Sequence, residues 1–248
     1  MSTEPVAAPI IQASKDPLEE LLSKFPEVEN RRMVTAVAEC CLAFKYNDLA
    51  EAAQCLGNYI KWRRKLFGNL EDQTIDEGLI EQLKSGFMNF SGKLEDGRGV
   101  IYLSMKHLDA TKYSTSLTIK AMHFFIMSAM LEDPLLCRDG FVLVTDMVDV
   151  SMKNLDLSFP GAIASAVSNS IPIRLKLIVI LHPPTIVRIL VPAVRAILSS
   201  TLLGRLYVVS STDALEQLLD AGAPVEGLLD TLDTESRVNR IINEQWLV

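Results

Sequence analysis

The side chains that could carry out chemistry are few and scattered along this 248-residue chain. Its three histidines, His107, His123 and His182, do not share a metal-ligand spacing. Asp146 and Asp149 follow an apolar run, where α/β enzymes place catalytic groups, but acids at a strand end also serve as caps and turn formers. The motifs H-E-x-x-H, G-x-S-x-G, G-x-x-x-x-G-K-S/T and G-x-G-x-x-G are absent. We therefore predict no catalytic residue, no metal site and no enzymatic activity.

The cysteines and the amino-terminal residues indicate the compartment. Cys40, Cys41, Cys55 and Cys137 show no C-x-x-C spacing. The polar start "MSTEPVAAPI" is not followed by the apolar core of a secretory signal. These features predict a cytoplasmic protein with reduced thiols.

Charge is distributed unevenly in this acidic chain, whose net charge is −7. Residues 157–212 contain no Asp or Glu but five basic residues, a local charge of +5: Arg174, Lys176, Arg188, Arg195 and Arg205. Residues 213–248 contain eight acids and two arginines, a local charge of −6. A basic, apolar segment favours an anionic and apolar partner over nucleic acid, although a buried core segment would also lack acids.

The segments that must position these residues change character along the chain. Residues 1–15 are predicted to be disordered, and Asp16 with Pro17 predicts the start of a helix. Asp48 can cap a second helix that ends at Gly68, and a short helix is predicted over residues 79–84.

The later part of the chain alternates between apolar runs and helix-length segments. The runs begin at Val100, Phe141, Leu175 and Arg205, and the segments between them cover residues 114–130, 154–169 and 185–199. This alternation predicts an α/β fold with a mostly parallel sheet. The expected domain organisation is a disordered terminus (1–15), a helical module (16–75), an α/β domain (76–230) and an acidic tail (231–248).

The segment 185–199 is almost entirely apolar, and its only charges, Arg188 and Arg195, lie on one helical face. A transmembrane helix needs about 20 apolar residues, and prolines and arginines interrupt this one. We therefore predict a helix that meets apolar surroundings on both sides rather than a membrane span.

The order of "DGRGVIYL", "DPLLCRDGFVLVTDM", "IPIRLKLIVILHPP" and "LLGRLYVVSS" resembles a CRAL-TRIO lipid-binding domain. The stretch "AFKYNDLAEAAQCLGNYIKWRRKLFG" is similar to the helical module that precedes such domains. The resemblance covers residues 30–229 and is closest to the tocopherol- and retinaldehyde-transfer branch. It implies a sheet that forms the floor of an apolar pocket, with residues 185–199 as a mobile lid.

The resemblance also implies a carrier that binds one small hydrophobic molecule, similar to tocopherol, a retinoid or a phospholipid, without another cofactor. The expected pocket residues are Phe124, Met127, Phe141, Leu143, Ile163, Val167, Ile173, Ile178, Ile186, Leu190 and Val194. His123 lies on a helix that is apolar on nearly every side, so its imidazole needs a polar partner. That partner is either a group of the ligand or a hydroxyl in the protein core, and His123 is the first candidate for a polar contact with the ligand inside the pocket.

A basic cluster is implied by the same resemblance. Arg174, Lys176 and Arg205 match positions that bind phosphoinositide headgroups, whereas a further family lysine is replaced by Thr201. We therefore expect transient docking on anionic membranes. The alternative is an interaction module with a collapsed pocket, which binds a protein partner or targets a membrane without transferring lipid.

Overall fold

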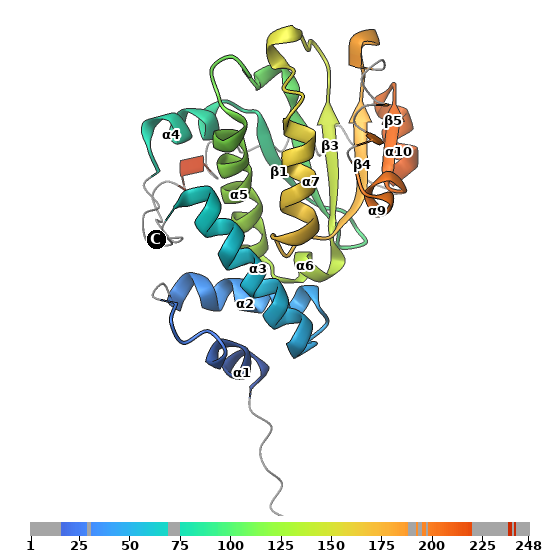
Figure 1. Cartoon of the computed structure of the whole chain (residues 1–248). Coiled ribbons are helices and arrows are strands. Elements are labelled where there is room, and N and C mark those ends of the chain that lie inside the picture. The colour runs from blue at the N-terminus through green and yellow to red at the C-terminus, as the bar shows by residue number, and fades with distance from the viewer. Residues whose placement is uncertain are drawn as a thin grey trace, which may run out of the picture.

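The computed structural model confirms the predicted α/β fold, in which helices flank a mostly parallel sheet (Figure 1). The residues it describes are 16–28, 31–68, 75–187, 192, 195–196, 198–219, 238–239 and 241. The predicted disordered terminus lies outside these residues, and so does most of the predicted acidic tail.

Helices α1 (Pro17–Ser23), α2 (Arg31–Phe44) and α3 (Leu49–Phe67) form the amino-terminal part of the fold. The predicted caps are confirmed. The Asp16 carboxylate accepts a hydrogen bond from the Leu18 amide at 3.0 Å, and the Asp48 carboxylate accepts one from the Glu51 amide at 2.9 Å. Gly68 ends α3 with a φ of 86°, a conformation that glycine adopts without strain. Helix α4 (Glu77–Lys84) follows.

The described residues form a five-stranded sheet in the order β1-β2-β3-β4-β5. Strands β2 (Gly99–Ser104), β3 (Phe141–Asp146), β4 (Leu175–Leu181) and β5 (Leu206–Val209) are parallel, as predicted. Strand β1 (Met88–Lys93) pairs antiparallel with β2 and was not predicted, because "MNFSGK" has no apolar run. The turn between β1 and β2 contains Gly97 at a φ of 89°.

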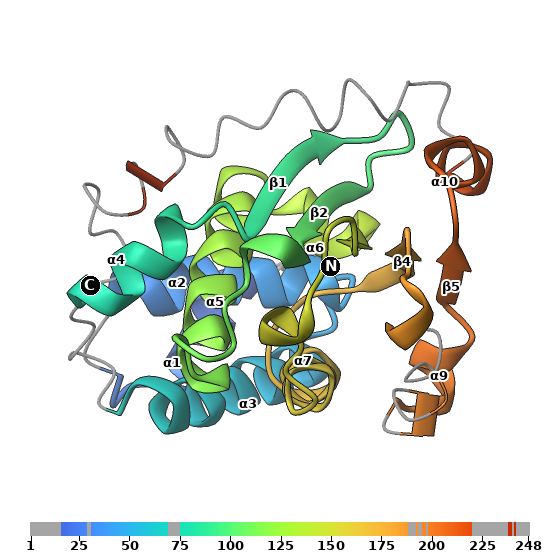
Figure 2. The ribbon, with the colours of Figure 1, turned by 90° about the horizontal axis from the view of Figure 1, so that it is seen from above.

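Helices cover both faces of the sheet. Helices α5 (Thr115–Glu132) and α7 (Phe159–Asn169) lie on one face and α10 (Thr212–Leu219) lies on the other (Figures 1 and 2). Short helices are also present: α6 (Leu135–Asp139), α9 (Ser200–Leu203), η1 (Met105–His107) and η2 (Met152–Asn154). Because successive strand residues face opposite ways, Leu143 belongs to the large core under α5 and α7, whereas Val144 belongs to the core under α10.

Two segments depart most from the helices predicted from the sequence. Helix α7 begins at Phe159 rather than at residue 154, because the residues before it form a turn in which the Asp156 carboxylate accepts a hydrogen bond from the Ser158 amide. The predicted lid falls partly outside the described residues, which omit 188–191, 193–194 and 197. Ser199, its predicted last residue, instead caps α9, where its hydroxyl accepts a hydrogen bond from the Leu202 amide at 3.4 Å.

Candidate functional site

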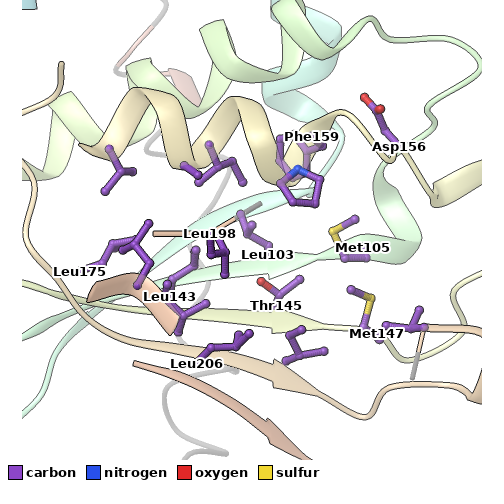
Figure 3. Close-up of a pocket in the computed structure, with 18 of the residues that line it drawn as sticks. Leu103, Met105, Leu143, Thr145, Met147, Asp156, Phe159, Leu175, Leu198 and Leu206 are labelled. Carbon is purple, nitrogen blue, oxygen red and sulfur yellow. The ribbon is translucent and has the colours of Figure 1, made fainter. Parts of the chain in front are cut away.

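A cavity of about 140 Å³ lies between α7 and the sheet (Figure 3). Twenty of the described residues line it, and eighteen of these are apolar. The volume is several times the roughly 30 Å³ that a water molecule takes up in the liquid. It is smaller than the roughly 300–1,000 Å³ that is usual for sites of drug-sized ligands. A lipid-sized occupant would therefore need α7 or its neighbours to move outward.

The walls of the cavity come from segments that are far apart in the sequence. Strands β2 to β5 form the floor with Leu103, Leu143, Thr145, Leu175, Ile178, Ile180 and Leu206, and the strand ends add Met105 and Met147. Helix α7 and the loop before it form the roof with Leu155, Asp156, Leu157, Phe159, Pro160, Ile163, Ala164 and Val167. Val187, Leu198 and Leu202 complete the lining.

The polar side chains in the described lining are those of Asp156 and Thr145. The Asp156 carboxylate accepts hydrogen bonds from the Thr115 hydroxyl at 2.5 Å and from the Ser158 hydroxyl at 2.6 Å. Burial alone would raise the pKa of Asp156, but these hydrogen bonds outweigh it and hold the pKa below its ordinary value. Asp156 is therefore an ionised group that fixes the start of α7.

Four of the predicted pocket residues line this cavity: Leu143 on the floor, Ile163 and Val167 on the roof, and Ile178 on the floor. Ile186 is 41% exposed, and the next residue, Val187, lines the cavity instead. Leu190 and Val194 lie outside the described residues.

Helix α5 does not contribute to this cavity, so His123, Phe124 and Met127 lie elsewhere in the core. The His123 ring nitrogen Nε2 is 2.9 Å from the Tyr59 hydroxyl on α3. Burial, together with the nearby positive charge of Arg63, holds the pKa of His123 well below its ordinary value, so the imidazole is neutral. The structure therefore favours the core-hydroxyl interpretation of His123 over contact with a ligand.

The other two predicted residues also lie away from the cavity lining. The ring of Phe141 packs edge-on against Phe90, with 6.4 Å between the ring centroids. Ile173 lines an adjoining surface hollow at the amino-terminal ends of β4 and β5, which shares Val167, Leu175 and Leu202 with the cavity lining. These residues help to form the core around the sheet rather than the walls of the cavity.

Two members of the predicted basic cluster line this surface hollow, which has a volume of about 370 Å³: Arg174 and Arg205. The Arg174 guanidinium donates to the Phe44 carbonyl at 2.8 Å and to the Tyr46 hydroxyl at 2.5 Å. Arg205 donates to the Leu175 carbonyl. Each guanidinium has five N–H groups, so both retain donors for an anion. Lys176 is exposed but does not line the hollow, so the structure brings together two of the three residues.

The two strand-end acids take part in turns. The Asp146 carboxylate accepts hydrogen bonds from the Val148 amide at 3.0 Å and from the Tyr102 hydroxyl. It also lies 3.0 Å from Nδ1 of His182. Asp149 has a φ of 57°, which is a turn conformation. Asp146 shares its face of the sheet with Val144 and thus points away from the cavity. No group of metal-ligating side chains is found among the described residues.

Sixteen of the twenty described lining residues are not among the predicted pocket residues, and strand alternation could have found two of them, Thr145 and Met147. They share the face of Leu143, since side chains two residues apart on a strand point the same way. Leu202 and Leu206 carry no comparable signal. Leu206 lines the cavity because the parallel pairing of β4 with β5 places it opposite Ile178, whereas Leu202 lies on α9, just before β5.

The chain is similar to known proteins in sequence and in structure. The CRAL/TRIO domain family matches residues 83–223. Clavesin-2 of Rattus norvegicus, Homo sapiens and Mus musculus is 25% identical over 175 residues, which is 68% of this chain and 53% of each relative. The chain therefore spans about half the length of these curated relatives. The crystal structure of Sfh5 matches 77% of this chain and 69% of its own chain, with a TM-score of 0.48 and 14% identity.

Proposed function

Because the chain belongs to the CRAL/TRIO domain family, which consists of lipid-binding domains, we propose that it binds one small hydrophobic molecule in the cavity under α7 and exchanges it with membranes. The observation that carries this proposal is the lining, in which eighteen of twenty described residues are apolar. Displacement of water from such a surface by a hydrocarbon is favourable, by roughly 25 cal/mol per Å² of apolar surface buried. The tocopherol and retinaldehyde branch stays a prediction.

Mass spectrometry of an organic extract of the natively purified chain tests this proposal. We expect one class of hydrophobic molecule at close to one molecule per chain. The control is an extract of the chain purified in urea and refolded without lipid, which should contain none. A native extract without a stoichiometric hydrophobic molecule, from a chain that also fails to take one up when it is supplied, contradicts the proposal.

Membrane docking through the surface hollow is the second part of the proposal. Arg174 and Arg205 supply two guanidinium groups, and Ser168, Ser199 and Thr201 add hydroxyls to the same lining. Guanidinium and hydroxyl donors suit a phosphorylated headgroup. No helix in the described part of the chain is long and apolar enough to cross a bilayer.

Co-sedimentation with vesicles that contain phosphatidylinositol phosphates tests the docking. Each basic residue near an anionic leaflet contributes about 1 kcal/mol, so Arg174→Gln and Arg205→Gln should each weaken binding about fivefold at physiological salt. Lys106→Gln is the matched control, because this exposed lysine follows the opposite, carboxyl end of β2. Equal binding by the wild type and by the Arg174→Gln, Arg205→Gln double variant contradicts the docking proposal.

The cavity volume of about 140 Å³ favours one second candidate, a CRAL/TRIO interaction module that transfers no lipid. In that case the space under α7 stays closed and the exposed apolar residues at its rim contact a partner. Leu157, which is 68% exposed, is such a residue. The extraction experiment separates the two candidates, because the interaction module should contain no stoichiometric lipid.

A further inference from the structure

We infer that Thr145 is a polar anchor in the cavity and that the occupant is a neutral lipophile with a single hydroxyl or carbonyl group. This inference rests on the proposed function, because it concerns the ligand of the same cavity. Thr145 is the fifth residue of β3, with Leu103 beside it on β2 and Ile180 on β4. Its hydroxyl lies on the floor of the cavity, beneath α7 (Figure 3).

The Thr145 hydroxyl forms no hydrogen bond within the described part of the chain, although it lies at a partly buried position. A hydroxyl has one donor and two acceptor lone pairs, and such groups are normally satisfied when they are away from bulk water. The surrounding side chains, such as Leu143 and Met147, offer no strong partner. A polar atom of the occupant would satisfy the hydroxyl.

The charges around the cavity define the class of the occupant further. No lysine, arginine or histidine is found among the described lining residues. A phosphate or carboxylate group placed there would lose its hydration without gaining a counter-charge, which is costly. The rim instead has the Asp156 carboxylate, whose oxygens already accept hydrogen bonds from Thr115 and Ser158. Among the described lining residues, Thr145 is therefore the group that can recognise a neutral polar atom.

The position of Thr145 also sets the orientation of the occupant. It lies near the carboxyl-terminal end of β3, whereas Leu175 and Leu206 lie at the amino-terminal ends of β4 and β5. The polar end of the ligand should therefore contact Thr145, and its hydrocarbon part should extend toward Leu175, Leu202 and Leu206.

Calorimetric titration of the delipidated full chain tests this inference, with 1-dodecanol, n-dodecane and dodecyl phosphate supplied from cyclodextrin. The substitution Thr145→Val keeps the shape of the side chain but removes the hydroxyl. A net hydrogen bond of ordinary strength predicts a loss of about three- to tenfold in the affinity for dodecanol. The affinity for dodecane should not fall, and Thr145→Ser should retain the affinity of the wild type for dodecanol.

The outcomes separate this inference from the proposed function. If Thr145→Val leaves the dodecanol affinity unchanged, or lowers the affinities for dodecanol and dodecane equally, Thr145 is not an anchor. If the wild type binds dodecyl phosphate more tightly than dodecanol, the neutral class of ligand is wrong. In both cases the cavity would still be a lipid site. Failure of the wild type to bind either dodecanol or dodecane would contradict the proposed function, and the inference with it.

Discussion

Ala164 lies on the cavity side of α7, where a larger side chain should fill empty space rather than displace neighbours. The residue is 9% exposed and lines the cavity of about 140 Å³. Ala164→Leu adds three carbon atoms, and burial of each contributes about 0.8 kcal/mol, or about 2.4 kcal/mol in total. The ordering of a leucine side chain costs about 0.5–1 kcal/mol of this. We therefore expect the free energy of unfolding of the ligand-free chain to increase by about 1.5 kcal/mol.

The matched control is Ala166→Leu on the same helix. Ala166 is 3% exposed, belongs to the large core and does not line the cavity. The same three carbons must there displace packed atoms, which typically costs about 1–3 kcal/mol. The two substitutions change helix propensity alike, so their opposite signs would come from the space around each residue.

Urea denaturation and thermal melting of the delipidated variants measure these changes. For a chain of this length, 1.5 kcal/mol corresponds to an increase in Tm of about 3–6 °C for Ala164→Leu. The same variant should bind dodecanol more weakly than the wild type, because the leucine occupies the space of the ligand. If Ala164→Leu destabilises the chain as much as Ala166→Leu does, the space under α7 cannot be filled and the reasoning is wrong.

Two further predictions concern the core and a turn. His123 has a lowered pKa in the folded chain, whereas the unfolded chain binds the proton near pH 6.5, so stability should be lost as the pH falls below 6.5. Urea denaturation should show that the free energy of unfolding is about 1.4 kcal/mol lower at pH 5.5 than at pH 7.5 because of this group. His123→Gln should abolish this difference, and an equal difference in the variant would contradict the assignment to His123. Gly140→Ala should lower the free energy of unfolding by more than about 1 kcal/mol, because φ is 93° and the new Cβ would lie 2.7 Å from the Arg174 carbonyl oxygen. Gly68→Ala is the control, because φ is also positive there but no atom lies within 4 Å of the new Cβ. If both variants lose the same free energy of unfolding, the contact with the Arg174 carbonyl oxygen contributes nothing to the loss.

Local signals in the sequence were sufficient for most of the elements. Asp16 and Asp48 cap the helices that they were predicted to cap, and Leu175–Leu181 is a parallel strand that is buried along most of its length. Each of these signals acts over a few residues, through a side chain that bonds the nearest amides or through apolar side chains on both faces. Strand β1 has neither signal, because its stability comes from pairing with β2 and from the cover of α5.

The site could be predicted only in part, because a cavity depends on which buried faces meet. The sequence shows that His123 is buried, but not that Tyr59, 64 positions away, faces it. The floor residues Leu143 and Ile178 were found because a sheet floor implies inward-pointing strand residues. Leu206 reaches the cavity through the pairing of β4 with β5 and Leu202 through the short helix α9 before β5, and no local pattern specifies either arrangement.

The central claim is that one hydrophobic molecule is held between α7 and the sheet. Photocrosslinking tests it most directly: a fatty alcohol that carries a diazirine group in its chain is bound, irradiated and located by peptide mass spectrometry. We predict adducts on α7, within residues 159–169, and on the floor strands, within 141–147 and 175–181, and excess dodecanol should suppress them. Adducts confined to α5, within residues 115–132, or to exposed segments, with no competition by dodecanol, would contradict the account.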